Sequence, residues 1–533
     1  MKISSRFLIA SASSLVIAAA TPAMAERVLR LNESPVGEID PAKGLDYADT
    51  VLAINLYDTL VYPAQGKPGI QPLLATEWTI DGPVYTFKLR DDVKFSSGNP
   101  LTAEDVVFSY ERFVALGQGY SNLFAGRVAS AEAVDPTTVR FTLTEPYAPF
   151  LTALTRLPVV DSKTVRANLA PGEFGDLGDY GAAYLAAHSA GSGAYVVESQ
   201  DPQTETVMVR NDGYFLPFAE NAPDRVRYRY GIEASTLRAL MSRGEHDVSD
   251  LWLPPEVIAA LADEGVAHLV TEKGGMGEYI KLNTSRAPLD DVHCRRALGY
   301  AYDYANTAML QRVNAEFSQA IPMTGVLPSG LAGYAADGTP FAQDMDKARA
   351  ELALCKYDPA EYPLDVAWIA EVPARERIAL LMQATFSQLG FKVNLVRTPW
   401  ALVVEQVANP ETGPHAVEIE VHPPTPDSDS LLYNMYSPDV PPTYLSTSGK
   451  LDDPKVVELL NAGRAETDEA KREAIYAELN AHLTELQPDI MAYEFIGVFA
   501  VRNGVEMPNF SDDAHRYSLT NFNMLFRDIS IND

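Results

Sequence analysis

Alternating apolar and polar residues predict short, half-buried strands in the first third of the chain. Along residues 84–95, Tyr85, Phe87 and Leu89 alternate with polar side chains, which is the two-residue period of a strand with one buried face. Residues 138–143 repeat this alternation. We therefore expect both runs to be strands that place their apolar side chains against one core.

A helix is expected between these two strands. Thr102 follows a Gly-Asn-Pro turn, and Asp105 stands three residues after it, which is the pattern of a capping box at a helix start. The apolar residues that follow recur at helical spacing on one face, which should pack against the strands. They are Val106, Val107, Tyr110, Phe113 and Val114.

The second half of the chain contains a strand-helix-strand pattern. Residues 364–370 are a continuous apolar run, residues 374–390 have helical periodicity and end in Gly390, and residues 391–396 resume a strand pattern. A unit of this length implies parallel pairing of its two strands. Ligands of open parallel sheets bind at the carboxyl ends of the strands, so Trp400, just past the second strand, is a candidate binding residue.

The first 25 residues are typical of a secretory signal peptide. Two basic residues precede an apolar segment at positions 7–20, and Ala23-Met24-Ala25 supplies an A-x-A cleavage pattern. Cleavage is expected after Ala25, which makes the mature protein periplasmic. The alternative is a single membrane anchor, but the apolar segment is short for a bilayer and the cleavage pattern follows it directly.

Length and charge limit the organisation and the partners of the chain. Its 533 residues exceed what one hydrophobic core usually organises, so two or more lobes are expected. Removing the two basic residues of the signal peptide (42 − 2) leaves 40 Lys and Arg against 72 Asp and Glu, a net charge of −32. Such a field repels nucleic acid and anionic membranes, and no nucleic-acid partner is expected. It also favours solubility, which is the simpler explanation.

No motif in the sequence supports catalysis or metal binding. The segment around Ser192 lacks G-x-S-x-G spacing, no Gly-rich loop precedes Lys-Ser or Lys-Thr, and H-E-x-x-H is absent. His415 and His422 are seven residues apart, which is not a metal-site spacing. The Asp-rich run at 426–430 has Pro438 where a calcium loop needs its glutamate. We predict a non-enzymatic protein with no cofactor and no bound metal.

The chain contains two cysteines, Cys294 near the start of one expected helix and Cys355 at the end of another. In an oxidising compartment they could form one disulfide or stay as two buried thiols. Their separation in the sequence does not decide between these alternatives.

Six segments spread along the mature chain carry the most specific sequence signal. They lie at residues 73–113, 191–197, 210–215, 237–257, 279–304 and 463–495. In this order they closely resemble the family 5 extracellular solute-binding proteins, the dipeptide, oligopeptide and nickel receptors of ABC importers. Because several long motifs agree, the resemblance covers nearly the whole mature chain.

The resemblance implies an α/β fold of the periplasmic binding protein type II-like class (cluster C), with two lobes, three subdomains and a hinge. Lobe I is expected to comprise residues 26–57, 193–282 and 498–533, with residues 58–192 as its extra subdomain. Lobe II is expected at residues 283–497. Chain crossings near Leu282 and Gly497 would act as the hinge, and a ligand that contacts both lobes would favour closure.

One loop departs from the pattern of the family's peptide receptors. In those receptors an aspartate that pairs with the peptide's amino terminus commonly stands three residues before an acidic triplet. Here the triplet is Asp427-Ser428-Asp429, and Pro424 stands three residues earlier. Proline has no charge to offer an ammonium group. The ordinary amine anchor is therefore expected to be missing, unless Asp427 or another acid has taken its role.

The resemblance also indicates aromatic residues that face the cleft. Trp400 follows a strand end that often lines the pocket, Trp252 lies in a loop that faces the cleft in relatives, and Tyr47 lies in an N-terminal loop near the ligand. Flat rings can stack on peptide planes, sugar faces or aromatic ligands, although packing in the core is the alternative. The predicted ligand-binding residues are Tyr47, Trp252, Trp400, His422, Asp427 and Asp429.

These observations predict the substrate-binding receptor of an ABC importer, which captures a peptide or peptide-sized solute and delivers it to an inner-membrane permease. A monomer is expected. The missing anchor leaves an oligosaccharide, an opine-like conjugate or a metal chelate as alternative ligands, while bare nickel is disfavoured. Two other functions stay open, a periplasmic enzyme on the same fold and a sensor or chaperone-like binding protein.

Overall fold

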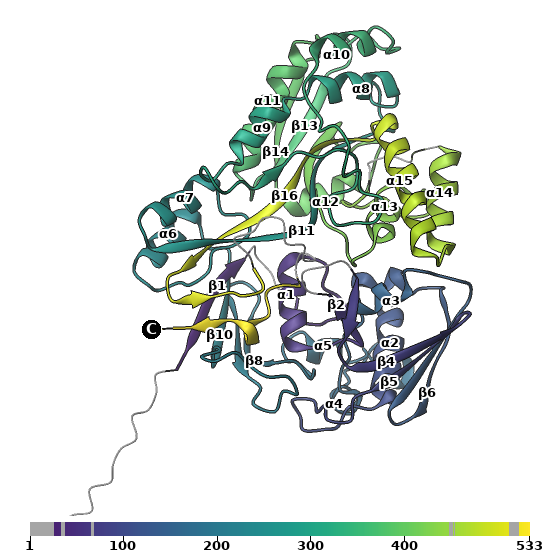
Figure 1. Ribbon diagram of the computed structural model, residues 1–533, viewed down its shortest axis with the longest axis vertical. Coiled ribbons are helices and arrows are strands. Elements are labelled where there is room, and N and C mark those ends of the chain that lie inside the picture. The colour runs from purple at the N-terminus through teal and green to yellow at the C-terminus, as the bar shows by residue number, and fades with distance from the viewer. Residues whose placement is uncertain are drawn as a thin grey trace, which may run out of the picture.

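The computed structural model describes residues 26–33, 38–64, 69–446, 451, 453–510 and 522–532. The predicted signal peptide and its cleavage site after Ala25 lie outside the described residues. Figure 1 shows two bodies, one above the other. Among the described residues, we call those within 26–266 and 503–532 the lower body, and those within 283–488 the upper body.

Two long strands, β11 (Ala267–Leu282) and β16 (Asp489–Arg502), join the two bodies. They pair antiparallel along nearly their whole length, with register shifts between Glu272 and Met276 and between Glu278 and Tyr279. Of the two predicted hinge positions, Leu282 is the last residue of β11 and Gly497 lies within β16. The predicted lobe and subdomain boundaries themselves stay a prediction.

The sheet that contains β11 and β16 extends through the upper body in the order β12-β16-β11-β15-β13-β14. Its other strands are β12 (Ala320–Ile321), β13 (Leu364–Ile369), β14 (Val393–Thr398) and β15 (Ala416–Val421). Single bridges of Val248 to Leu31 and to Val501 connect it to the lower body's sheet. That sheet has the order β1 (Val28–Glu33), β10 (Arg225–Tyr230), β9 (Glu205–Arg210) and β8 (Tyr195–Asp201).

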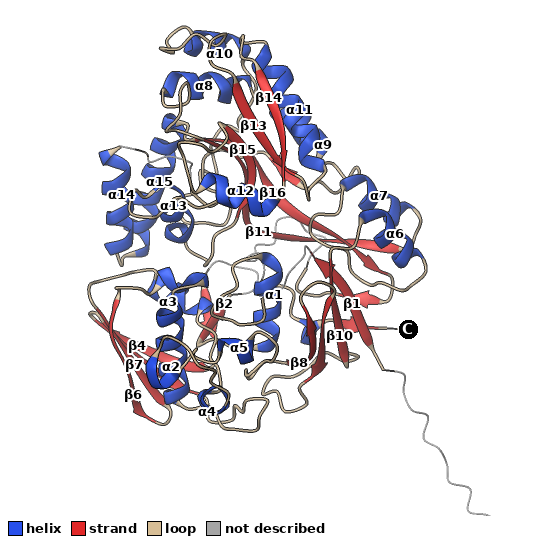
Figure 2. Cartoon of the chain, turned by 180° about the vertical axis from the view of Figure 1, so that it is seen from behind, coloured by secondary structure: helices blue, strands red, loops and turns tan. Residues whose placement is uncertain are grey.

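The predicted strand-helix-strand unit is confirmed. β13 and β14 pair in parallel, and α11 (Ala374–Ser387) connects them. Alternate side chains of β13 enter different cores: Val366 packs with the buried face of α11, whereas Ala367 packs with the helices on the other side of the sheet. Figure 2 shows these helices on the two sides of the strands. The sheet is therefore buried on both faces, as expected for parallel strands.

The predicted strands of the first third are also confirmed. They are β5 (Val84–Leu89) and β7 (Thr138–Leu143), the central strands of a sheet completed by β4 (Ala75–Asp81) and β6 (Val128–Asp135). The expected helix is α2 (Ala103–Leu116), with the capping box of Thr102 and Asp105.

The buried surface of α2 is wider than the predicted apolar face. Val106 and Phe113 are buried against the small sheet as expected. Phe108 and Arg112 are buried as well, because residues around Tyr180 cover the helix on another side. The sequence pattern marked only the side that packs on the strands.

The other helices surround these sheets. In the lower body they are α1 (Tyr47–Leu56), α3 (Phe150–Ala153), α4 (Ser162–Ala167), α5 (Ala182–Leu185), α6 (Ala234–Ser242) and α7 (Pro255–Asp263). In the upper body they are α8 (Val292–Ala301), α9 (Tyr304–Leu310), α10 (Met345–Leu352), α12 (Trp400–Val407), α13 (Ser428–Tyr436), α14 (Pro454–Ala465) and α15 (Glu469–Leu486). Short strands β2 (Val61–Pro63), β3 (Ile70–Pro72), β17 (Val505–Glu506) and β18 (Ser530–Ile531) complete the fold.

The two cysteines form a disulfide. Cys294 in α8 is bonded to Cys355, which follows α10, across a sequence separation of 61 residues. The bond fastens two peripheral helices of the upper body to each other, and it resolves the alternative that the sequence left open.

Candidate functional site

A cavity of about 420 Å³ lies where the two bodies meet. The lower body contributes the end of β1, the N-terminal turn of α1 and the loop before α7. The upper body contributes the ends of β13 and β15, the starts of α11 and α12, and the loop that contains Tyr444. The lining residues are Glu33, Asp46, Tyr47, Ala48, Trp252, Ile369, Glu371, Val372, Arg375, Trp400, Ala401, Ile419, Glu420, His422 and Tyr444.

The position of this cavity follows from the direction of the strands. β13 pairs in parallel with both β14 and β15, so the three carboxyl ends meet at one edge of the sheet. Ile369 ends β13, Trp400 comes two residues after β14, and His422 follows β15. The carboxyl edge is the expected place for a ligand of such a sheet.

Tyr47 is held in the cavity wall as the first residue of α1. Asp46 caps this helix in a capping box with Asp49, which fixes the first turn and therefore the direction of the Tyr47 ring. The Tyr47 hydroxyl donates a hydrogen bond to Glu272 Oε2 at 3.2 Å. Because Glu272 belongs to β11, the wall that Tyr47 forms is attached directly to a strand that joins the two bodies.

Trp252 and Arg375 meet across the two bodies. Trp252 belongs to the lower body and lies over the Arg375 guanidinium group, with 5.6 Å between the ring centre and Cζ. The other neighbour of the ring is Phe495 of β16, at 5.6 Å between ring centres. Trp252 is only partly buried, so part of its ring stays available to a ligand.

Trp400 forms the opposite aromatic wall. It is the first residue of α12, and its ring meets the Tyr444 ring edge-on, at 5.0 Å between centres. The Trp400 backbone N–H donates to Glu371 Oε2 at 3.0 Å. This arrangement places an aromatic pair and a carboxylate on the same side of the cavity.

The polar lining is dominated by carboxylates. Glu33, Asp46, Glu371 and Glu420 line the cavity, while Arg375 is its one lining arginine. That arginine already forms an ion pair with Glu278, outside the lining, at 2.7 Å. The lining therefore has more negative than positive charge.

Asp46, Glu420 and His422 lie close together at the boundary between the bodies. His422 Nδ1 is 3.3 Å from Glu420 Oε1. Asp46 is exposed to the cleft, but the protein around it is dense enough for burial to raise the pKa of its carboxyl group. His422 lowers this pKa and Glu420 raises it. A carboxylate of the lower body thus faces one of the upper body.

The other two predicted ligand-binding residues, Asp427 and Asp429, are not in the lining of this cavity. Asp427 caps α13 by accepting from the Asp429 backbone N–H, and it forms two hydrogen bonds with Arg472 at 2.6 and 2.8 Å. Asp429 pairs with Arg464 at 3.0 Å, and burial raises its pKa to about 6. Both side chains have partners within the upper body.

Pro424 contributes through its backbone. Its carbonyl oxygen accepts a hydrogen bond from Arg156 Nε, from the lower body. The position that was expected to lack an amine anchor therefore faces an arginine. This contact is consistent with a loop that does not receive a ligand ammonium group there.

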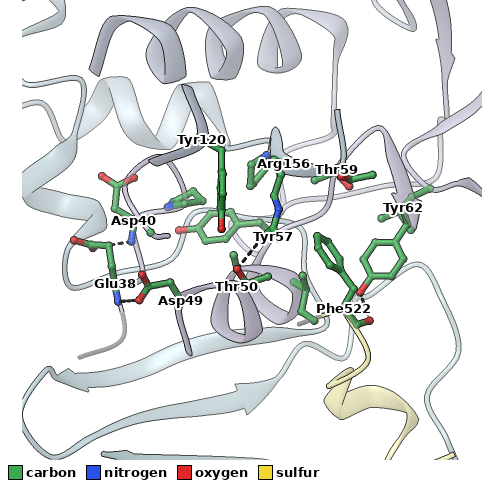
Figure 3. A pocket seen from close by; sticks show the side chains of 17 residues that line it. Glu38, Asp40, Asp49, Thr50, Tyr57, Thr59, Tyr62, Tyr120, Arg156 and Phe522 are labelled. Atoms are coloured by element: carbon green, nitrogen blue, oxygen red, sulfur yellow. Dashed lines mark hydrogen bonds between the residues drawn. The ribbon is translucent and has the colours of Figure 1, made fainter. Parts of the chain in front are cut away.

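A smaller cavity, of about 40 Å³, lies beside α1 in the lower body. Figure 3 shows Arg156 pointing toward Thr50 inside it, with Tyr120 on one side and Phe522 on the other. Its volume suffices for a few water molecules, so it is too small to hold a peptide-sized solute.

Several lining residues were not identified from the sequence. Glu420 is the last residue but one of β15, and its position near a strand end could have marked it. Glu33, Glu371 and Arg375 belong to local patterns with no chemical signature, and Tyr444 comes from a loop more than 20 residues after β15. These residues meet only through the tertiary fold.

The described residues contain neither a metal-binding cluster nor a helix that could cross a membrane. Within them, no three His, Cys, Asp or Glu side chains form a group that could hold a metal ion. In the same part of the chain, every helix is too short or too polar to span a bilayer.

The sequence matches a known family over most of its length. The model of the bacterial extracellular solute-binding proteins, family 5 Middle, matches residues 69–441. The probable D,D-dipeptide-binding periplasmic protein DdpA of Escherichia coli is 31% identical over 380 residues, which cover 69% of this chain and 70% of that protein. Heme-binding protein A of Haemophilus influenzae is 29% identical over 378 residues, 65% of each chain.

Solved structures share the fold across almost the whole chain. The periplasmic binding protein DppA of Helicobacter pylori, in complex with the peptide STSA, superposes with a TM-score of 0.78 at 21% identity, covering 95% of this chain and 99% of that one. NikZ of Campylobacter jejuni, in complex with Ni(L-His), gives a TM-score of 0.77 at 18% identity, with 94% and 99% covered. The two-body α/β architecture is therefore that of periplasmic binding proteins.

Proposed function

The chain belongs to the bacterial extracellular solute-binding proteins of family 5, the receptors that serve ABC importers, and we propose that its ligand is a dipeptide-sized solute with a cationic amine. The observation that carries this proposal is the lining of the 420 Å³ cavity, which both bodies form and in which carboxylates and aromatic rings predominate.

The cavity volume favours a small ligand over a long peptide. Small-molecule sites typically measure roughly 300–1,000 Å³, and 420 Å³ is near the lower end of this range. A compound of two residues fits such a volume better than an oligopeptide. The name of the relative DdpA, a probable D,D-dipeptide-binding protein, agrees with this size class.

The charges of the lining favour a cationic group on the ligand. Asp46 and Glu420 approach from different bodies, and burial of two like charges near each other is unfavourable unless a cation or a proton lies between them. An ammonium group at this place would interact with both carboxylates. The amine would then lie near β15 and the start of α1, away from Pro424 and its arginine partner.

The aromatic residues supply the apolar part of the site. Trp252 and Trp400 come from different bodies, and Tyr444 lies against Trp400. Rings of this kind bind peptide planes and side chains with little loss of conformational entropy. Contacts to both tryptophans at once would favour the closed arrangement of the bodies.

The remaining parts of the proposal concern the protein's context. The mature chain begins at Glu26 after cleavage and acts in the periplasm, as a monomer that presents both bodies to a permease in the inner membrane. It binds and releases its ligand without catalysis. These statements rest on the family and on the signal-peptide pattern.

Calorimetry with four probes tests the ligand class: L-alanyl-L-alanine, D-alanyl-D-alanine, glutathione and N-acetyl-L-alanyl-L-alanine. We expect a free-amine dipeptide to bind, and acetylation of the amine to weaken binding at least roughly ten-fold, because the ammonium loses its carboxylate partners. Equal binding of the acetylated compound would refute the cationic requirement. If no probe binds, and native mass spectrometry of the purified protein detects a retained oligosaccharide, opine-like conjugate or chelate, the ligand is of that alternative class.

A further inference from the structure

The guanidinium group of Arg156 is buried in the lower body without an ion-pair partner among the described residues. Its residue is 5% exposed, and burial lowers the pKa of the group, opposed only by tyrosines. Two other buried arginines, Arg112 and Arg375, have carboxylate partners, whereas buried Arg295 uses its donors on three backbone carbonyls. An unpaired buried cation is costly, so the contacts that Arg156 does make need an explanation.

Arg156 contacts three separate parts of the chain. Its Nε donates to the Pro424 carbonyl oxygen of the upper body, and its Nη1 donates to Thr50 Oγ1 of α1 at 2.8 Å. Its Cζ lies over the rings of Tyr120 and Phe522, at 4.4 and 4.6 Å from their centres. Nη2 is buried and has no hydrogen-bond partner in the described structure.

These contacts connect the two walls of the ligand cavity from behind. Thr50 is one turn after Tyr47 in α1, and Pro424 comes two residues after His422, and both Tyr47 and His422 line the cavity. The Pro424 contact forms only when the upper body approaches the lower body. If the bodies separate, Arg156 loses this acceptor and water takes its place.

The surroundings argue against an anion-binding role for Arg156. The adjacent cavity of about 40 Å³ is lined by three acidic residues, Glu38, Asp40 and Asp49. Asp40 is paired with Arg112, and burial raises the pKa of Asp49 to about 7, so this lining offers an anion no positive charge other than that of Arg156. Cation–π contacts with Tyr120 and Phe522 already stabilise the guanidinium group. What the surroundings supply is a directed hydrogen bond across the two bodies.

We propose that Arg156 is a positioning residue of this receptor: it holds the closed arrangement by donating to the Pro424 carbonyl, and so sets how much of the protein is closed before a ligand arrives. The proposal rests on the proposed receptor function, since closure matters only for a binding cleft. It assigns the contact to a backbone carbonyl, so the side chain at position 424 has little effect on it.

The test measures the closed-to-open ratio of the mature protein by single-molecule fluorescence transfer, with no added ligand. Dyes are placed at two exposed positions, Glu132 in β6 of the lower body and Glu473 in α15 of the upper body. Arg156→Met removes the donors and keeps an apolar side chain of similar length. We expect this substitution to lower the ratio roughly ten-fold or more, as loss of a hydrogen bond from a charged donor would.

Two controls separate positioning from general stability. Arg210→Met removes another arginine that lies over an aromatic ring, that of Phe218, at 4.0 Å within the lower body. Pro424→Ala keeps the accepting carbonyl. In both variants the closed-to-open ratio should stay within about two-fold of that of the unmodified protein, since neither removes the hydrogen bond from Arg156 to the Pro424 carbonyl.

If the methionine variant does not fold, Arg156→Lys is the substitute, because it keeps the positive charge. It should also lower the ratio, because the flexible ammonium group lacks the planar fork that directs one nitrogen at Pro424 and another at Thr50. An unchanged ratio in either Arg156 variant, or no closed population in the unmodified protein, would overturn the proposal. The readout needs no ligand. Failure of the dipeptide assay would therefore leave this result unaffected, and the two proposals can fail separately.

Discussion

Arg375 and Glu278 form a buried ion pair, 2.7 Å apart, directly behind the ligand cavity. Glu418 of the neighbouring strand interacts with the same pair and is completely buried, and neither of its carboxyl oxygens has a hydrogen-bond partner in the described structure. Two carboxyl groups thus share one arginine. Burial raises the pKa of Glu278 to about 7 and raises that of Glu418 well above its usual range, so the pair retains a proton near neutral pH.

This shared proton predicts a pH dependence of stability. A carboxyl group whose pKa is higher in the folded than in the unfolded protein stabilises the fold when it is protonated. This stabilisation is complete at pH values below the pKa in the unfolded chain, near 4.5, and it is lost as the pH rises through the folded-state pKa of about 7. Glu418→Gln removes one of the two carboxyl groups. We expect this substitution to increase the free energy of unfolding at pH 7.5 by roughly 1–3 kcal/mol. The free energy of unfolding should then fall less steeply between about pH 5 and 7.5 than it does in the unmodified protein. Urea unfolding at both pH values measures this.

The matched control is Glu132→Gln, which changes an exposed carboxylate of β6. It should leave the pH dependence of stability as it is in the unmodified protein. Identical pH slopes for Glu418→Gln and the unmodified protein would mean that the buried pair holds no proton.

Trp400 should contribute directly to affinity. Trp400→Ala removes an aromatic wall of the cavity and is expected to weaken binding by roughly 1–3 kcal/mol through lost contact area. Leu402→Ala changes an exposed residue of the same helix, outside the lining, and should change affinity little. Calorimetry with a dipeptide that binds the unmodified protein compares the two. Equal losses would indicate an effect on α12 rather than contact with the ligand.

The sequence predicted the elements of the fold where local periodicity and caps agree. β13, α11 and β14 were predictable because each has its own apolar pattern and because the turns between them are short. The buried width of α2 was not, since the contact of Phe108 with Tyr180 involves a segment about 70 residues later. Local patterns indicate that a face is apolar, and distant segments decide how much more becomes buried.

The candidate site was predictable in part for the same reason. Trp400 and His422 follow strands whose parallel pairing could be inferred, and both line the cavity. Asp427 and Asp429 appeared available because the sequence does not reveal that Arg472 and Arg464, from two later helices, pair with them. A carboxylate in a loop has the same local pattern whether its partner is a ligand or a distant arginine.

Asp427 should therefore affect stability more than binding. Asp427→Asn keeps a capping side chain for α13 but breaks the buried pair with Arg472. We expect a loss of roughly 3 kcal/mol in the free energy of unfolding and a dissociation constant within about three-fold of the unmodified protein. Thermal unfolding and calorimetry on the same preparation measure both. If binding of a free-amine dipeptide disappears while the fold is intact, Asp427 has taken the anchoring role.

The disulfide should be complete in the exported protein. A thiol titration of the denatured chain without reductant is expected to find no free thiol, because Cys294 and Cys355 are paired. Replacing both by serine should lower the free energy of unfolding by about 4 kcal/mol, the loop-closure value for a separation of this length. Affinity should be unchanged, since α8 and α10 do not line the cavity. Two thiols per chain would contradict the bond.

Ligand binding should shift the protein toward a more compact shape without changing its secondary structure. Tyr47 and Trp252 of the lower body and Trp400 and His422 of the upper body line one cavity, so a ligand gains all four contacts only when the bodies are closed, and this differential affinity drives the equilibrium. Small-angle X-ray scattering at saturating dipeptide should give a smaller radius of gyration, with an unchanged far-ultraviolet circular dichroism spectrum. The Arg156→Met protein sharpens the measurement: if it starts from a more open population, its radius should fall further on binding. A saturating ligand that leaves the radius unchanged in both proteins would show that the bodies do not move, and the cavity would then act as a rigid site.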